Sequence, residues 1–64
     1  MQLASAIKEA RAEAGLSQEA LALEAGIDRT YISQLERGVA NPSLLVLYKL
    51  SKILGVELEV GLRR

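Results

Sequence analysis

The sequence predicts an all-α fold of short helices, and three observations lead to this prediction. Apolar residues recur at three- and four-residue spacing through most of the 64-residue chain, which is the pattern of amphipathic helices. Glycines follow these apolar runs, and Ser or Asp residues precede several of them, as at the ends of helices. Half of the residues are hydrophobic, so one domain with one small core is expected over residues 1–64.

Two helices are expected in the N-terminal half. The first ends near Gly15, and the second begins after Ser17, an N-cap candidate, with Glu19 beside the positive end of the helix dipole. The second helix ends at Gly26. The apolar sides of these two helices are predicted to consist of Leu3, Ile7, Ala10 and Ala14, and of Leu21, Ala22 and Ala25.

Two further helices are expected in the second half. The third follows Asp28, another N-cap candidate, and ends at Gly38 after Arg37. The fourth begins between residues 41 and 43, beside the only proline, and runs to about residue 54, before Gly55. The residues predicted to face the core are Ile32 and Leu35 on the third helix and Leu44, Leu47, Leu50 and Leu54 on the fourth.

The C-terminal tail, residues 56–64, carries a different pattern. Val56, Leu58 and Val60 alternate with two glutamates, and this period is typical of a strand. A lone strand needs a partner, which would come from a second copy of the chain or from another protein. An extra helical turn that packs Val56 and Leu58 on the core is the alternative, and the sequence leaves both open.

Residues 17–38 indicate a helix-turn-helix motif. Helices that cross closely need a small residue at their contact, and Ala22 supplies it. The turn needs a residue that tolerates positive φ, and Gly26 supplies it. The apolar side chains that would hold the crossing are Leu21, Ile27, Ile32 and Leu35. Because every one of these positions meets its physical demand, the motif is a specific signal.

The strings GLSQ, LA, AGIDRTYISQLERG, NPSL and LGV resemble the Cro/repressor-type helix-turn-helix family, also called lambda-repressor-like or XRE-like. The resemblance extends from about Ile7 to Val56. It implies a compact four- to five-helix lambda-repressor-like domain, a homodimer, and binding to palindromic operator DNA. In that family the second helix of the motif enters the major groove.

The resemblance implies base-reading roles on the outward side of the third helix. Arg29, Thr30 and Gln34 match positions on that side, and Ser33 is a weaker candidate. Arg29 can pair with guanine, Gln34 with adenine, and the Thr30 methyl group with a thymine methyl. The alternative is that these side chains are only solvated, or that Arg29 pairs with Asp28.

Contacts with the DNA backbone are implied elsewhere. Gln18, with Ser17 beside it, matches the family position at the start of the motif's first helix, where a phosphate is bound. Arg37 and Asn41 lie in or beside the loop that touches phosphates in the family. Tyr31 is expected to pack at the edge of the core, and the alternative is that its hydroxyl reaches a phosphate.

Arg11 and Glu36 match a further pair of family positions, late in the first helix and near the end of the third. The family links these residues in a partly buried ion pair, so the resemblance implies such a pair here. Two separate, exposed charges are the alternative. The expected role of the pair is structural, because it would fix the orientation of the third helix.

The formal net charge of zero opposes nucleic-acid binding, since DNA-binding domains are usually basic. Of the eight basic residues, only Arg29 and Arg37 clearly fall on the expected DNA side. So few ionic contacts predict weak non-specific affinity and a modest dependence on salt. A dimer would double the contacts, and we therefore expect DNA binding to require one.

A dimer interface is predicted on the fourth helix and the tail. Three apolar residues of this helix fall outside its expected core side, which suggests a second buried surface. Scattered apolar residues on an ordinary surface are the alternative. The predicted interface residues are Leu45, Val46, Ile53, Leu58 and Val60.

These observations predict a cytoplasmic transcriptional regulator that acts as a homodimeric repressor on double-stranded DNA. The alternatives are an antitoxin-type regulator that also binds a toxin, and a protein-interaction module without DNA binding. No cofactor, metal ion or membrane contact is expected, because the chain has no Cys, no His and no long apolar segment. No small-molecule ligand is expected either, because 64 residues leave no room for a ligand-sensing domain. Catalysis is not expected, since Ser17 and Ser33 have no His to activate them.

Overall fold

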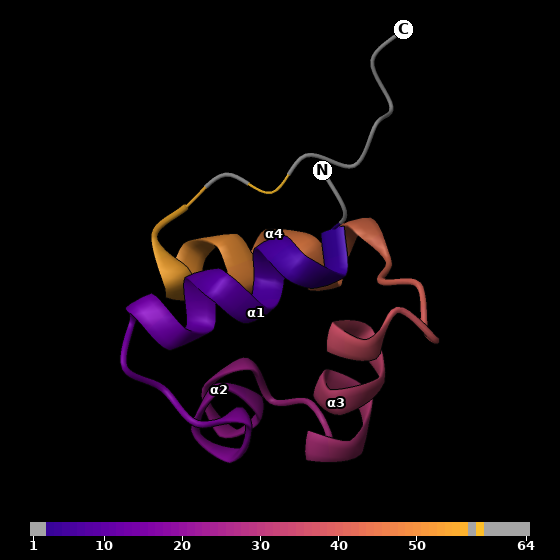
Figure 1. The fold of residues 1–64 in the computed structure, drawn as a ribbon, viewed down its shortest axis with the longest axis horizontal. Coiled ribbons are helices and arrows are strands. Elements are labelled where there is room, and N and C mark those ends of the chain that lie inside the picture. The colour runs from indigo at the N-terminus through magenta and orange to yellow at the C-terminus, as the bar shows by residue number, and fades with distance from the viewer. Residues whose placement is uncertain (1–2, 57, 59–64) are drawn as a thin grey trace, which may run out of the picture.

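The structure, a computed structural model, describes residues 3–56 and 58. This part of the chain forms four α-helices: α1 (Leu3–Glu13), α2 (Gln18–Ala25), α3 (Arg29–Arg37) and α4 (Leu44–Leu54). α1 and α4 lie together in one layer, and α2 and α3 lie below them (Figure 1). The predicted all-α class is confirmed, and the described residues contain no strand and no fifth helix.

Local signals set the helix ends where the sequence predicts them. The Ser17 hydroxyl accepts a hydrogen bond from the Ala20 amide at 3.0 Å, and the Ser43 hydroxyl accepts one from the Val46 amide at 3.2 Å. These caps satisfy N–H groups that have no partner in the first turn of a helix. α4 therefore begins at Leu44. Each of the four helices is followed closely by a glycine of positive φ, the usual helix ending.

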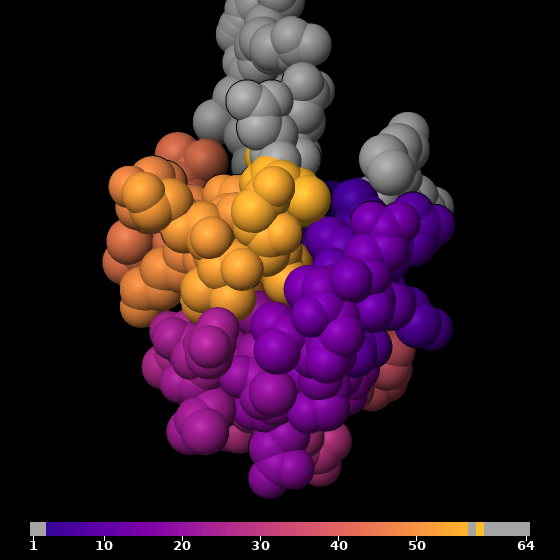
Figure 2. Space-filling view, turned by 90° about the vertical axis from the view of Figure 1, so that its left-hand side faces the viewer, coloured from indigo at the N-terminus to yellow at the C-terminus, as the bar shows by residue number. Residues whose placement is uncertain are grey.

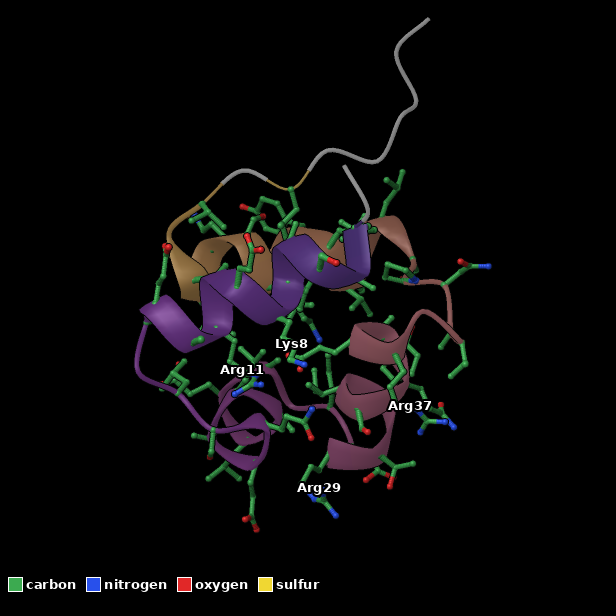
Figure 3. All side chains as sticks on the ribbon, viewed as in Figure 1. Lys8, Arg11, Arg29 and Arg37 are labelled. Atoms are coloured by element: carbon green, nitrogen blue, oxygen red, sulfur yellow. The ribbon has the colours of Figure 1, made fainter. Side chains whose placement is uncertain are left out.

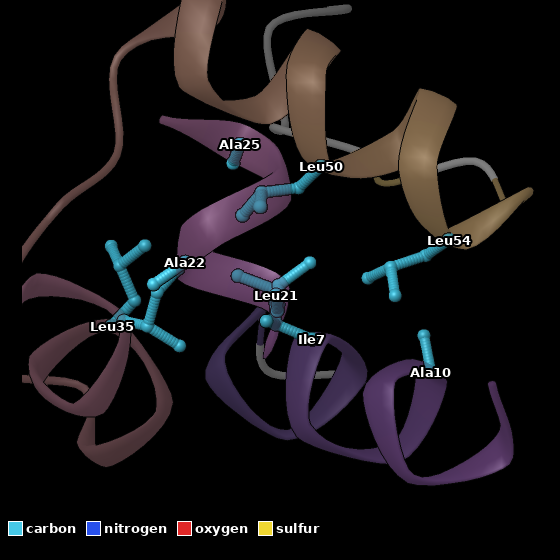
Figure 4. Packing of buried hydrophobic residues seen from close by; sticks show 9 residues of the cluster. Ile7, Ala10, Leu21, Ala22, Ala25, Leu35, Leu50 and Leu54 are labelled. Atoms are coloured by element: carbon cyan, nitrogen blue, oxygen red, sulfur yellow. The ribbon is translucent and has the colours of Figure 1, made fainter. Parts of the chain in front are cut away.

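The core lies between the four helices, and the buried residues among those described are all hydrophobic. Figure 4 shows side chains from all four helices converging there. The largest fully buried side chains are Ile7, Leu21, Ile32, Leu35 and Leu50. Burial of each side chain of this size contributes about 1.5–3 kcal/mol. The predicted inward positions Leu47 and Leu54 are also buried.

Four predicted positions differ from the structure. Ala14 is exposed because α1 ends at Glu13 and leaves Ala14 in the following turn. Leu44, expected on the core side of α4, is 60% exposed, since it is the first residue of that helix. Val46 and Ile53, expected off the core side, are partly buried and pack against the core. The covered side of α4 is therefore broader, and begins later, than its leucine spacing predicts.

On the side of the molecule away from α3, α4 packs against its two neighbouring helices. In space-filling view, the atoms of α4 lie directly against those of α1 and α2 (Figure 2). Within residues 3–56 and 58, no helix is both long enough and apolar enough to cross a membrane. This arrangement leaves α3 at one edge of the domain (Figure 1).

Candidate nucleic-acid interface

The turn over residues 26–28 joins α2 to α3 and sets their crossing. Gly26 has φ 68° and ψ 36°, a left-handed conformation that costs residues with a Cβ atom free energy. Its amide donates to the Leu23 carbonyl at 3.3 Å, and the Ile27 amide donates to the Ala22 carbonyl at 2.9 Å. This pair of bonds forms a Schellman ending. Asp28 then caps the first turn of α3.

The side chains at the crossing are those that the motif predicts. Ala22 is 3% exposed and lies in one buried cluster with Leu21, Ile32 and Leu35. Ile27 packs against the same cluster. A small side chain at position 22 lets α2 approach α3 closely, because a larger one would need the space that its neighbours fill. The apolar positions of the predicted motif and the conformation of Gly26 are confirmed.

The side of α3 opposite the core carries a polar stripe. Its residues recur at helical spacing and so lie along one side of the helix. We call this the outward stripe, and it consists of Arg29, Thr30, Ser33, Gln34 and Arg37. Arg29, Thr30 and Arg37 are exposed, whereas Ser33 and Gln34 are partly buried. Figure 3 shows Arg29 and Arg37 extending from α3 away from the other helices.

The outward stripe has the chemistry to bind an anionic surface that also offers hydrogen-bonding groups. Both of its charges are positive. Its hydroxyl and amide groups can donate as well as accept hydrogen bonds. Asp28, the acidic residue next to the stripe, has its carboxylate oriented toward the Thr30 amide at 3.4 Å. It therefore acts on the helix end, as the N-cap prediction requires.

The first turn of α2 lies beside the last turn of α3. Ser17 is exposed and caps α2, and Gln18 follows it as the first helical residue. The Gln18 side chain is partly buried, and its Nε2 donates to Glu36 Oε1 at 3.0 Å. Gln18 is thus held by a residue of α3.

Arg11 and Glu36 are in direct contact, where the resemblance implies an ion pair. Arg11 Nε lies 2.7 Å from Glu36 Oε2, and Arg11 Nη2 donates to Glu36 Oε1 at 3.1 Å. The two side chains are 15% and 2% exposed. Arg11 Nη1 also donates to the Leu16 carbonyl at 2.8 Å, just before α2. One guanidinium therefore links α1, the α1–α2 loop and α3 (Figure 3).

Both ionised forms of this pair are stabilised by their surroundings. Burial of the Glu36 carboxyl acts to raise its pKa, but hydrogen bonds from Arg11 and Gln18 and the charges of Arg11 and Lys8 outweigh burial. The net result is a pKa of Glu36 below its ordinary value. The hydrogen bond to Glu36 raises the pKa of Arg11 above its ordinary value, against the opposing effect of burial. The pair is charged throughout the neutral pH range.

The loop after α3 is tied back to α3 by Tyr31. The Tyr31 hydroxyl donates to the Asn41 carbonyl at 3.2 Å, and the Tyr31 ring packs against the core. The predicted packing of Tyr31 is therefore confirmed. Asn41 itself is exposed, as is Arg37 at the end of α3. These two residues lie at the edge of the domain where the outward stripe ends.

The residues predicted for a dimer interface are not all on one surface. Leu45 is 63% exposed, whereas Val46, Ile53 and Leu58 pack partly against the chain's own core. Val60 lies outside the described residues. The packing of Leu58 agrees with the alternative in which the tail covers the core, although α4 ends at Leu54. Residues 57 and 59–64, which carry most of the predicted strand, also lie outside the described part.

A different apolar surface is exposed at the N-terminal half of α4. Leu44, Leu45 and Tyr48 are each about 60% exposed there. They recur at helical spacing, so their side chains lie on one side of the helix. Lys52 Nζ lies 5.5 Å from the centre of the Tyr48 ring and borders this surface. We call Leu44, Leu45 and Tyr48 the α4 patch.

Two features of the site were not predicted from the sequence. One is the hydrogen bond between Gln18 and Glu36, which lie 18 residues apart. No local pattern marks such a bond, and the position of Gln18 at the start of a helix indicates only a contact with an anion. The other is the membership of Leu44 and Tyr48 in the exposed surface of α4. Whether Leu44 and Tyr48 are exposed depends on which other helices cover α4, and no local sequence pattern shows this.

Comparisons with known proteins agree with this geometry. The sequence model of the helix-turn-helix family matches residues 7–60. The HTH-type transcriptional regulator y4dJ of Sinorhizobium fredii is 46% identical over 46 residues, which are 72% of this chain and 60% of that protein. The control protein C.BamHI of Bacillus amyloliquefaciens is 51% identical over 45 residues, which are 70% of this chain and 56% of that protein. The chain thus matches less than two thirds of the length of either relative.

Solved structures have the same helix arrangement. The restriction-modification controller protein C.AhdI from Aeromonas hydrophila aligns with a TM-score of 0.81 and 42% identity, over 86% of this chain and 83% of that one. The master regulator for biofilm formation SinR, solved in complex with DNA, aligns with a TM-score of 0.83 and 38% identity, over 89% and 92% of the two chains. With its helix crossing, its polar stripe and these matches, the chain belongs to the helix-turn-helix family of the Cro/repressor type, a family of transcriptional regulators.

Proposed function

We propose that this protein is a sequence-specific regulator of transcription that binds double-stranded DNA through the major groove. The observation that carries the proposal is the outward stripe of α3, which is polar, positively charged and opposite the buried side chains of Ile32 and Leu35. Such a helix can present its polar side to the groove while its apolar side chains stay packed against the rest of the domain. The similarity to SinR, which was solved in complex with DNA, supports the same assignment.

Within the groove, the stripe would divide base reading among its members. Arg29 would form a bidentate pair with guanine and Gln34 with adenine. The Thr30 methyl group would contact a thymine methyl, and Ser33 would make a weaker polar contact. Each bidentate pair discriminates against a wrong base by about 1–3 kcal/mol. Because Gln34 is partly buried and Arg29 is exposed, we expect Gln34 to have the more restricted geometry.

Contacts to phosphates would hold the domain in register. Ser17 and Gln18 at the start of α2, and Arg37 and Asn41 at the end of α3 and in the loop, are the proposed phosphate contacts. Arg37 is the last residue of the outward stripe, and Gln18 lies beside the last turn of α3, so these contacts would fix the position of that helix along the groove. The Tyr31 hydroxyl, which donates a hydrogen bond to the Asn41 carbonyl, would support these phosphate contacts by holding the loop that carries Asn41.

The chain would act as a homodimeric repressor on a palindromic operator. Each copy brings only Arg29 and Arg37 to the outward stripe, so a second copy would double the ionic contacts. The α4 patch offers an apolar surface for a two-fold contact, and Val60, which the sequence predicts at the dimer interface, would contribute to that contact. Two copies would then place their α3 helices about 34 Å apart, one turn of DNA.

A protein-interaction module without DNA binding is the contrasting hypothesis, and the neutral net charge favours it. The outward stripe opposes it, because a surface for protein docking is usually centred on apolar or aromatic residues. One related solved structure is a complex of the SinR protein with the SinI protein. If this chain also binds a protein partner, such as a toxin, it would do so in addition to binding DNA.

DNA binding can be tested by selection of bound duplexes from a random pool, followed by titration of the recovered sequence at several salt concentrations. A palindrome is expected, with a shallow salt dependence. Arg29→Ala should weaken binding and relax the preference at one base pair. Lys49→Ala removes the same charge from the exposed surface of α4 and should leave that preference unchanged. Recovery of no common sequence would contradict the proposal.

The homodimer can be tested by sedimentation velocity at micromolar concentration. Leu45→Lys places a charge in the α4 patch and should shift the protein to a monomer. Leu23→Lys is the matched control, since Leu23 is 82% exposed on α2 and lies outside that patch. A wild-type monomer at this concentration, or equal effects of the two variants, would exclude the proposed interface.

A further inference from the structure

The amide group of Gln18 has a fixed orientation in this structure. Its Nε2 lies 3.0 Å from Glu36 Oε1. An ionised carboxylate only accepts hydrogen bonds, so the nitrogen end of the amide, and not its oxygen, must face Glu36. A charge-assisted bond of this kind is stronger than a bond between neutral groups. The amide of Gln18 is therefore not a freely rotating surface group.

Glu36 can hold Gln18 only because Arg11 holds Glu36. The carboxylate receives two hydrogen bonds from Arg11, at 2.7 and 3.1 Å, and its side chain is 2% exposed. Arg11 also binds the Leu16 carbonyl, two residues before Gln18. The same guanidinium thus positions both the backbone before α2 and the acceptor of the Gln18 side chain.

The ion pair also removes an electrostatic obstacle. An unpaired carboxylate close to a phosphate would repel it, because like charges a few ångströms apart are unfavourable even near a surface. Arg11 neutralises Glu36 at contact distance, and the charge of Lys8 acts on the same carboxylate. Glu36 can therefore stand close to a bound phosphate without weakening the contact.

One N–H of the Gln18 amide is used by Glu36, and the second has no acceptor among the described residues. Gln18 is also the first residue of α2, where backbone N–H groups lack helical partners. We propose that Glu36 is a positioning residue for DNA: held by Arg11, it turns the Gln18 amide so that its second N–H meets a backbone phosphate. This inference rests on the proposed DNA-binding function.

The positioning role predicts a coupling that a purely structural ion pair would lack. Operator duplexes that carry one neutral methylphosphonate at a time would identify the phosphate bound by Gln18. At that phosphate the substitution should weaken binding of the wild type about tenfold, the effect of losing one charge-assisted bond. Gln18→Ala should bind this duplex and the unmodified operator equally well. Glu36→Gln should show the same loss of sensitivity.

The matched control is a second phosphate, identified as the one whose methylphosphonate effect disappears in Arg37→Ala. Glu36→Gln should retain full sensitivity there, because Arg37 is exposed and does not depend on the Gln18 amide. If Glu36→Gln keeps its sensitivity at the Gln18 phosphate, or loses sensitivity at both phosphates alike, the positioning role is wrong. If wild-type protein binds no DNA, both the proposed function and this inference fail.

A measurement on the unaltered protein covers the case in which Glu36→Gln does not fold. In the NMR spectrum of the free wild type, the two side-chain amide protons of Gln18 should be widely separated in chemical shift, with one exchanging slowly with water. Addition of operator should shift the second proton as well. Amide protons at the positions of a freely rotating glutamine would overturn the proposal.

Discussion

Glu36 in the last turn of α3 and Arg11 near the end of α1 form a two-point ion pair across 25 residues of sequence, with 2.7 Å between Arg11 Nε and Glu36 Oε2. The Glu36 side chain is almost fully enclosed, and Arg11 is slightly more open. Because burial deprives both charges of water, each depends on the other for its stabilisation. The stability of the domain and its dependence on pH should both reflect this contact.

Removal of one partner should destabilise the domain strongly. Glu36→Ala leaves Arg11 with an uncompensated charge in a mostly buried place and also removes the acceptor for Gln18. The expected loss is about 3 kcal/mol, which for a domain of this size lowers Tm by more than 10 °C. Thermal unfolding followed by circular dichroism measures it. Glu24→Ala, at an exposed position on α2, should change Tm by only a few degrees, and a similarly small change for Glu36→Ala would contradict the structure.

Acid should destabilise the protein through Glu36. The pKa of this carboxyl in the folded state lies below its ordinary value of 4.5. The unfolded chain therefore takes up the proton first, and the stabilisation is complete above the ordinary pKa and lost as the pH falls through the folded one. Urea unfolding at a series of pH values between neutrality and 3 should show this decline. Glu36→Gln cannot ionise at this position, so its free energy of unfolding should decline less steeply with falling pH than that of the wild type. Parallel declines for the two proteins would rule out a contribution from Glu36.

The turn between α2 and α3 should tolerate asparagine better than alanine. Gly26 has φ 68°, and a Cβ atom added there would meet nothing within 4 Å. Gly26→Ala should therefore lower the free energy of unfolding by about 1 kcal/mol, because alanine disfavours this backbone conformation and not because its Cβ atom would clash. Gly26→Asn should cost less, because Asn enters the left-handed region more readily. Equal Tm values for glycine and alanine at this position would show that the turn does not have the described conformation.

Ala22 should be intolerant of a larger side chain. It is 3% exposed at the crossing of α2 with α3, and extra methylene groups in a filled core cost about 1–3 kcal/mol. Ala22→Leu should also displace α3 and thereby reduce operator affinity more than it reduces the folded fraction. Ala12→Leu, at an exposed position on α1, provides the same substitution without the crossing. Calorimetry and DNA titration of the two variants together would reveal whether the effect is specific to the crossing.

Most of the fold follows from local sequence signals. Ser17, Asp28 and Ser43 cap the helices they precede, and Gly26 and Gly38 end the helices they follow. These signals act within a few residues, so a single sequence contains them. The crossing of α2 and α3 could also be predicted, because its demand for a small residue and a left-handed turn is local.

The errors concern contacts between distant parts of the chain. Leucine spacing correctly identifies Leu50 and Leu54 as buried, but it cannot show that Leu44 lies past the covered part of α4. It also cannot show that Val46 and Ile53 have neighbours in the core. The same limit applies to the site, where the bond from Gln18 to Glu36 depends on how α2 and α3 pack.

The division of α3 into an apolar inner side and a polar outward stripe has an evolutionary consequence. Ile32, Leu35 and the two cap residues of α3, Asp28 and Gly38, determine where α3 sits, and none of them belongs to the outward stripe. Substitutions at the exposed members of the stripe, Arg29, Thr30 and Arg37, can therefore accumulate with little effect on folding, since changes at exposed positions usually cost less than about 0.5 kcal/mol. A duplicated copy of this gene could acquire a new operator by altering the stripe alone, while its scaffold remains under separate selection for stability.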